Sequence, residues 1–159
     1  MNQAILILPA VILLVLQSCT TDNAGKKETV SPLIQGLTSS IDNTPYSARI
    51  QQNSIKRLVP NSDKNKKEGV EEYIIDASVL ETYRGQKTDT VRYSVFVEKG
   101  ESMSISEKAL VVSLCIENGR YYWPGVGASF PVSDTVQMAA KKLAKTVNVS
   151  QQSFRDCEY

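Results

Sequence analysis

The sequence predicts a mainly β fold, a small antiparallel barrel or sandwich with one helix near the C-terminus. Several short segments alternate apolar and polar residues and are separated by turn-forming residues. Helical patterns do not alternate with these segments, so the parallel sheet of an α/β fold is not expected. A single convincing helical pattern follows the last predicted strand.

The first predicted strand begins near Tyr46. Its alternation is broken between Ile50 and Ile55, which predicts a strand that carries a bulge. A polar, locally basic loop follows at residues 60–69. Such a loop is typical of a solvated hairpin tip, but it could also meet anionic lipid headgroups or peptidoglycan carboxylates. The candidate basic residues in this loop are Lys64, Lys66 and Lys67.

Three further strands are predicted between residues 70 and 116. Residues 70–83 have apolar side chains on both phases of the alternation, which indicates a long, curved strand whose buried face shifts midway. Residues 91–98 alternate cleanly and predict a strand with one buried face. Residues 109–116 are almost continuously apolar and predict a strand buried on both faces.

The last predicted elements are a hairpin and the helix. Asn118-Gly119 is a strong signal for a two-residue hairpin turn, because both central residues of such a turn need positive φ. Residues 120–123 then form the returning strand. Residues 133–147 predict a helix. Ser133 or Asp134 can cap it, and apolar side chains then recur at helical spacing from Val136 to Val147.

Composition argues against several classes of function. The chain has 18 Lys and Arg against 17 Asp and Glu, so no bulk attraction to nucleic acid is expected. It has no His, which removes the commonest general base and the commonest metal ligand, and we expect neither a cofactor nor a metal. No hydrolase, zinc-protease or phosphate-loop motif is present, and the adjacent Glu71 and Glu72 would face apart on a strand. An enzyme is therefore not expected.

The N-terminal residues carry the clearest resemblance to a known class. The uncharged apolar run of residues 4–16 is too short to span a bilayer and ends at Leu16-Gln17-Ser18-Cys19. A Leu three residues before a Cys, with a small residue directly before the Cys, resembles the lipobox of bacterial lipoproteins. The resemblance implies cleavage before Cys19 and acylation of Cys19, which would anchor the chain in the envelope membrane. A cleaved signal without lipid, or an uncleaved anchor, is the alternative.

The same resemblance predicts location and domain organisation. The residue directly after Cys19 is Thr20 and not Asp, which favours the outer membrane, with the protein facing the periplasm. We expect a signal peptide at residues 1–18, a flexible tether at 19–44 and the folded domain at 45–159. Within the tether, residues 33–41 could form at most a short helical turn.

If Cys19 is acylated, Cys115 and Cys157 remain as a pair in an oxidising compartment. We expect them to form a disulfide that ties the end of the chain to a central strand. The alternative is one reactive thiol, but nothing near Cys115 in the sequence would lower its pKa.

The segment Val79-Leu80-Glu81-Thr82-Tyr83-Arg84-Gly85, followed by Asp89-Thr90-Val91, resembles a strand–turn–strand pattern of tissue-inhibitor-of-metalloproteinases and netrin-like domains. The return strand beginning at Gly119 resembles theirs as well. This resemblance implies an OB-like five-stranded antiparallel barrel with a flanking helix. Metalloprotease inhibition does not follow from it, because Cys19 is separated from the barrel and the family's multiple disulfides are absent.

One candidate binding surface is an aromatic rim at the end of this barrel. Aromatic side chains beside a Gly/Pro loop could bind a protein or a sugar, or one phase could belong to the core and the other cover the barrel mouth. Alternation places Tyr122 opposite its two neighbours. The candidate rim residues are Tyr121, Trp123, Pro124 and Gly125.

These observations favour a non-catalytic protein-binding module, attached to the membrane through acylated Cys19, with an envelope protein as its partner. An inhibitor or immunity lipoprotein against a periplasmic enzyme such as a cell-wall hydrolase is the first alternative. A structural component of an envelope assembly is the second.

Overall fold

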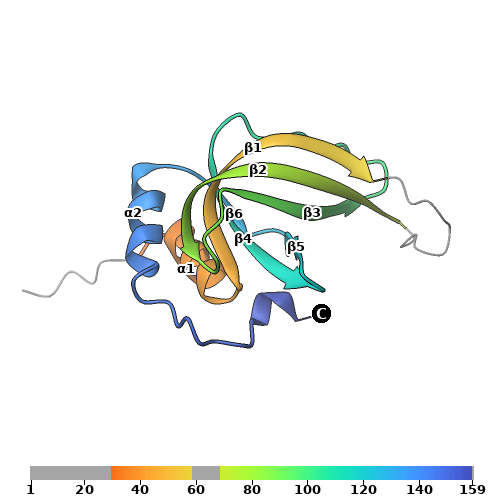
Figure 1. Ribbon diagram of the computed structural model, residues 1–159. Coiled ribbons are helices and arrows are strands. Elements are labelled where there is room, and N and C mark those ends of the chain that lie inside the picture. Colours follow the sequence, from red (N-terminus) through yellow and green to blue (C-terminus); the bar gives the residue numbers. More distant parts are fainter. Residues whose placement is uncertain (1–29, 59–68, 159) are drawn as a thin grey trace, which may run out of the picture.

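A five-stranded β-barrel, three of whose strands continue beyond it as a curved arm, forms the body of the computed structural model (Figure 1). The structure describes residues 30–58 and 69–158. The elements in chain order are α1 (Pro32–Asp42), β1 (Tyr46–Leu58), β2 (Val70–Arg84), β3 (Thr90–Glu98), β4 (Leu110–Glu117), β5 (Arg120–Tyr122), β6 (Ser129–Pro131), α2 (Asp134–Leu143) and the 3₁₀ turn η2 (Arg155–Cys157).

The barrel closes in the strand order β1-β2-β3-β5-β4, with β4 pairing back to β1. All of these pairings are antiparallel except β3 with β5, which is parallel and joins Tyr93 to Tyr121. The barrel is therefore mixed, and the expectation of a purely antiparallel barrel was wrong. The connection at residues 99–109 carries the chain from β3 to a strand that pairs with β1. Strand β5, which follows β4 through the hairpin turn, lies between β4 and β3 and runs parallel to β3.

Bulges bend the long strands so that they can close the barrel. The pairing of β1 with β2 slips by one residue at three places, which leaves Asn53 on β1, and Leu80 and Tyr83 on β2, as the extra residues. The predicted bulge in the first strand is confirmed. The slip at Leu80 also explains the predicted shift of face, because Ile75 lies in the barrel core whereas Tyr83 packs beneath the helices.

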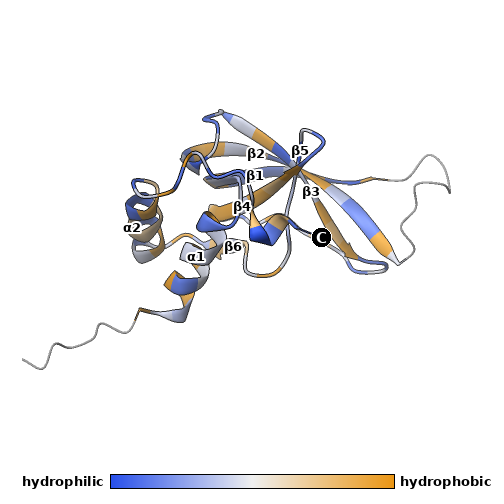
Figure 2. Ribbon diagram, turned by 90° about the horizontal axis from the view of Figure 1, so that it is seen from below, coloured by the Kyte–Doolittle hydropathy of each residue, from blue (hydrophilic) through white to orange (hydrophobic). Residues whose placement is uncertain are grey.

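The interior is divided into two apolar clusters that share β4. Val112 and Leu114 point into the barrel, where they join residues such as Ile75. Val111 points the other way, toward the helices. As predicted, β4 is buried on both faces, and its ribbon is mostly hydrophobic in Figure 2.

The structure has two helices where the sequence predicted one. Helix α1 lies inside the segment expected to be a tether, yet Leu37 and Ile41 are fully buried against Phe130 and the second helix. The folded domain therefore begins before residue 45, at about the start of α1. The predicted C-terminal helix is confirmed as α2, and the Ser133 hydroxyl caps it by accepting from the backbone N–H of Val136.

The two helices and the free part of the arm lie at opposite ends of the molecule. Figures 1 and 2, turned by 90° from each other, both show α1 and α2 at one end and the outer ends of β1, β2 and β3 at the other. The chain enters the domain at the helical end, because α1 is the first described element. At the tight β4–β5 turn, Asn118 has φ 49° and Gly119 has φ 76°, as the predicted hairpin requires.

Candidate functional site

The residues of the predicted aromatic rim, Tyr121, Trp123, Pro124 and Gly125, are all half-buried. The ring of Tyr121 packs against that of the fully buried Tyr46, with 4.8 Å between centroids. Trp123 also packs against the barrel core, and its backbone N–H donates to the carbonyl of Ser94. Among the described residues, its indole Nε1 is buried with no hydrogen-bond partner. Tyr121 and Trp123 therefore pack against the barrel core, and they offer a partner only part of their surface.

As the alternation predicts, Tyr122 faces away from its two aromatic neighbours. Its hydroxyl donates to the carbonyl of Cys157, 3.3 Å away, on the outer side of the barrel. Pro124 and Gly125 begin the loop to β6, and this loop carries a fully exposed Val126 between two glycines of positive φ. An exposed apolar side chain on such a loop can reach into a concave partner.

The predicted disulfide between Cys115 and Cys157 is present, with Cα atoms 5.5 Å apart. Cys115 is fully buried on the outer side of β4, and the C-terminal segment covers it. The bond spans 42 residues of sequence and fixes η2 against β4. Its role in this position is to hold the tail of the chain on the barrel.

A second attachment of the tail, which the sequence did not reveal, is made by Arg84. Its guanidinium is buried between the end of α1 and the C-terminal segment, and burial lowers the pKa of this group. It donates to backbone carbonyls at the end of α1 and in the tail, and it lies over an aromatic ring. These contacts are with Ile41 O at 3.0 Å, Asp42 O at 3.2 Å, Asn148 O at 2.9 Å, Gln151 Oε1 at 2.9 Å and the Phe154 ring at 4.9 Å from its centroid.

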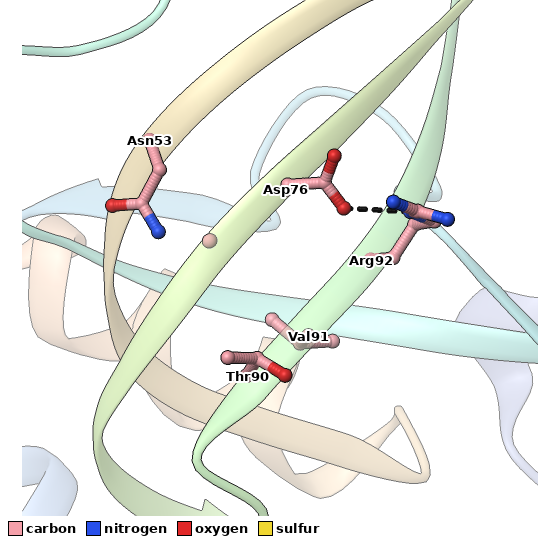
Figure 3. Close-up of a pocket in the computed structure, with 6 residues that line it drawn as sticks. Asn53, Asp76, Thr90, Val91 and Arg92 are labelled. Carbon is pink, nitrogen blue, oxygen red and sulfur yellow. Dashed lines mark hydrogen bonds and ion pairs between the residues drawn. The ribbon is translucent and has the colours of Figure 1, made fainter.

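A shallow pocket of about 300 Å³ lies across three neighbouring strands on the outside of the barrel. Figure 3 shows Asn53, Asp76, Thr90 and Arg92 around it. The bulge on β1 turns the Asn53 amide toward β2, where it hydrogen-bonds the hydroxyl of Ser78 at 2.9 Å. The hydrogen bond and charge of Arg92, with Nε 2.6 Å from Asp76, lower the pKa of that carboxyl. The pair neutralises both charges, so the pocket offers hydrogen bonds but no net charge.

The outer face of the arm carries three exposed apolar side chains around one carboxylate. Glu72 on β2 pairs with Leu58 on β1 and with Phe96 on β3, and Val70 is two residues away on the same face of β2. Leu58 is 42% exposed, Val70 38% and Phe96 43%. The Glu72 carboxylate accepts from the Ser94 hydroxyl at 2.6 Å. We call Leu58, Val70, Phe96 and the central Glu72 the arm patch.

The structure does not reach some of the predicted site residues. Cys19 and the basic-loop residues Lys64, Lys66 and Lys67 lie outside the described residues. Within residues 30–58 and 69–158, no group of three or more His, Cys, Asp or Glu side chains is arranged to hold a metal ion. In the same part of the chain, no helix is both long and apolar enough to cross a membrane.

Comparison with known proteins assigns the chain to no family. No protein-family model matches the chain, and no curated protein sequence is significantly similar to it.

Proposed function

We propose that the protein is a lipid-anchored component of the bacterial envelope, whose barrel acts as a non-catalytic protein-binding module in the periplasm. The Leu16–Cys19 segment supports the anchor and the location. The observation that carries the binding function is the arm patch, where three large apolar side chains are exposed together on one sheet face. Grouped exposed apolar side chains of this kind mark interaction sites more often than scattered ones do.

The barrel is assigned to the OB-like class as part of this proposal. Five strands in the order β1-β2-β3-β5-β4, closed by β4 with β1, match the Greek-key barrel of that class. The assignment explains how one small barrel can carry long strands on one side, because strongly bent β1 and β2 contribute both to the closed barrel and to the arm.

The position of the arm patch suits a protein partner of a membrane-anchored module. The anchor would enter at the helical end, and the arm points the other way (Figure 1). The patch is therefore presented away from the anchored end, where a partner can reach it without displacing the tether. The carboxylate of Glu72, already bonded to Ser94, would add a fixed acceptor at the centre of the apolar contact.

The test is co-purification of the acylated protein with its partner from envelope membranes, compared between variants. We expect L58D and V70D each to abolish a stoichiometric complex, because each would bury an unpaired carboxylate beside Glu72, whose own carboxylate is bonded to Ser94. V149D, at an exposed valine outside the arm, is the matched control and should retain the complex. Loss of the complex in all three variants, or in none, would contradict binding through the arm patch.

A specific observation also favours the second candidate function, inhibition of a periplasmic enzyme. The fully exposed Val126 stands on a glycine-flanked loop, a shape that can enter an enzyme cleft. If the protein is an inhibitor that acts through this loop, V126D should relieve inhibition of a cell-wall hydrolase whereas L58D leaves it unchanged. The opposite pattern would assign any inhibition to the arm patch.

A further inference from the structure

Helix α2 has one buried face and one basic, exposed face. Val136 and Ala140 are fully buried against α1 and β4. At 100° per residue, Met138 and Lys142 point to the other side of the helix. Met138 is 65% exposed, and Lys142 is exposed, as is Lys145 in the turn that follows. The solvent-facing side of α2 therefore combines one large apolar side chain with two exposed cations.

The acidic groups nearby leave these two cations uncompensated within the described residues. Glu81, which forms an ion pair with a lysine of α2, is already shared between Lys141, at 3.5 Å, and Arg49, at 3.8 Å. It also accepts from the hydroxyl of Tyr83. Asp134 stands at the opposite end of α2, in its first turn. The C-terminal half of the exposed face is therefore positive.

This positive face lies at the end of the domain where the anchor would enter. Helices α1 and α2 pack together, and both views place them opposite the arm. Eleven peptide units separate Cys19 from Val30, a span of at most about 40 Å when fully extended. Val30 and Leu33, at the start of α1, are themselves about half exposed. An acylated Cys19 would therefore keep the start of α1 within about 40 Å of the bilayer, at the end of the domain where α2 lies.

We propose that the exposed face of α2, with Met138, Lys142 and Lys145, docks on the anionic phospholipid surface of the membrane that holds the anchor. This orientation rests on the proposed lipid anchor. Each lysine close to an anionic surface strengthens such binding about fivefold, and the tether keeps the local concentration of the helix high. Docking through α2 would direct the arm patch away from the bilayer.

The test uses the acylated full-length mature protein, first checked for acylation by mass, in bilayers of phosphatidylcholine with about 30% phosphatidylglycerol. A fluorophore is attached at M138C or, as the matched control at the arm, at K56C. We expect lipids that carry a quencher to quench the label at position 138 several-fold more than the label at position 56. The difference should vanish in pure phosphatidylcholine and in about 1 M salt, where the Debye length is about 3 Å.

Charge variants then separate α2 from other basic residues. K142Q/K145Q should weaken the docking equilibrium about 25-fold, whereas K56Q/K99Q, at the arm, should leave it unchanged. No quenching at position 138 would overturn the proposal and would indicate that α2 faces solvent or a protein. Equal quenching at both positions would also overturn it, because it would show that the domain has no preferred orientation on the bilayer. An unacylated chain would instead contradict the proposed anchor, and the initial mass measurement detects that outcome separately.

Discussion

The guanidinium of Arg84 lies over the ring of Phe154, 4.9 Å from the ring centroid, and so joins the end of β2 to the tail of the chain. The same guanidinium donates to carbonyls of α1, whose last turn leaves carbonyls without helical partners. One buried cation therefore holds three segments that are far apart in the sequence. With the Cys115–Cys157 disulfide, it fixes the tail on the barrel.

Replacing this cation should destabilise the domain strongly. R84A leaves one buried and two partly buried backbone carbonyls without this donor, and we expect a loss of about 3 kcal/mol in the free energy of unfolding, measured by urea denaturation. R155A is the control in the same tail, because Arg155 is largely exposed and its ion pair with Asp156 is at the surface. Equal losses of unfolding free energy in R84A and R155A would show that Arg84 does not hold β2, α1 and the C-terminal tail together.

Replacing Gly85, the residue after Arg84, should destabilise the domain for two separate reasons. Its φ is +86°, and a Cβ would lie 2.8 Å from the carbonyl oxygen of Pro45. Gly100 has φ +95° but nothing within 4 Å of its Cβ position. We expect G100A to lose about 1 kcal/mol from backbone strain alone and G85A to lose about 3 kcal/mol or more. Similar losses in thermal or urea unfolding would contradict the close approach to Pro45.

The disulfide should contribute stability without shaping the barrel. In the chain-entropy model, a loop closed across 42 residues gives about 4 kcal/mol, less any strain. C115A/C157A should therefore unfold at clearly lower urea concentration, while its far-ultraviolet circular dichroism stays that of a β-barrel. Loss of the folded spectrum in the absence of urea would mean that the tail is required for folding of the barrel.

Truncating the half-buried Trp123 should lower the free energy of unfolding. Trp123 packs against the barrel core, so W123A should cost about 2 kcal/mol, less than a fully buried Trp would. V126D, three residues later on the exposed loop, should leave the unfolding free energy nearly unchanged. If W123A were as neutral as V126D, the indole would be a free binding platform, as the alternative interpretation of the sequence holds.

Tyr83 should make stability fall at high pH. Burial, with a further contribution from the carboxylate of Glu81, raises the pKa of Tyr83 to about 12. A raised pKa favours the neutral phenol in the folded state, so this contribution is complete below the unfolded pKa of about 10 and is lost as the pH rises toward 12. Y83F should show a smaller decline in unfolding free energy between about pH 9.5 and 11.5. Parallel declines in the two proteins would contradict this assignment.

The local features of the fold could be predicted from the sequence, whereas the long-range ones, apart from the Cys115–Cys157 disulfide, could not. The bulge before Ile55, the turn at Asn118 and the helix after Ser133 depend on neighbouring residues. Helix α1 was expected only as a short helical turn in the tether, because Ser, Thr and Gly lower its helix propensity and its stability comes from burial of Leu37 and Ile41. The parallel pairing of β3 with β5 depends on how the connection at 99–109 crosses the barrel.

The candidate surfaces differ in the same way. The rim residues were visible as an aromatic cluster, but their burial depends on Tyr46, which is 75 positions before Tyr121 in the chain. The arm patch was missed because Leu58, Val70 and Phe96 come together only through the strand register. Phe96 is a large apolar residue in the otherwise polar, outward-facing phase of its strand. This was the one signal in the sequence that could have pointed to the patch.

The most direct test of the account is the intact mass of the protein extracted from envelope membranes, with and without reductant. We expect a chain that begins at Cys19, carries added acyl mass, and gains two hydrogen atoms on reduction of the Cys115–Cys157 bond. A chain without acyl mass would contradict the lipid anchor, and with it the proposed location and the orientation of α2. A chain whose mass does not change on reduction would contradict the attachment of the tail.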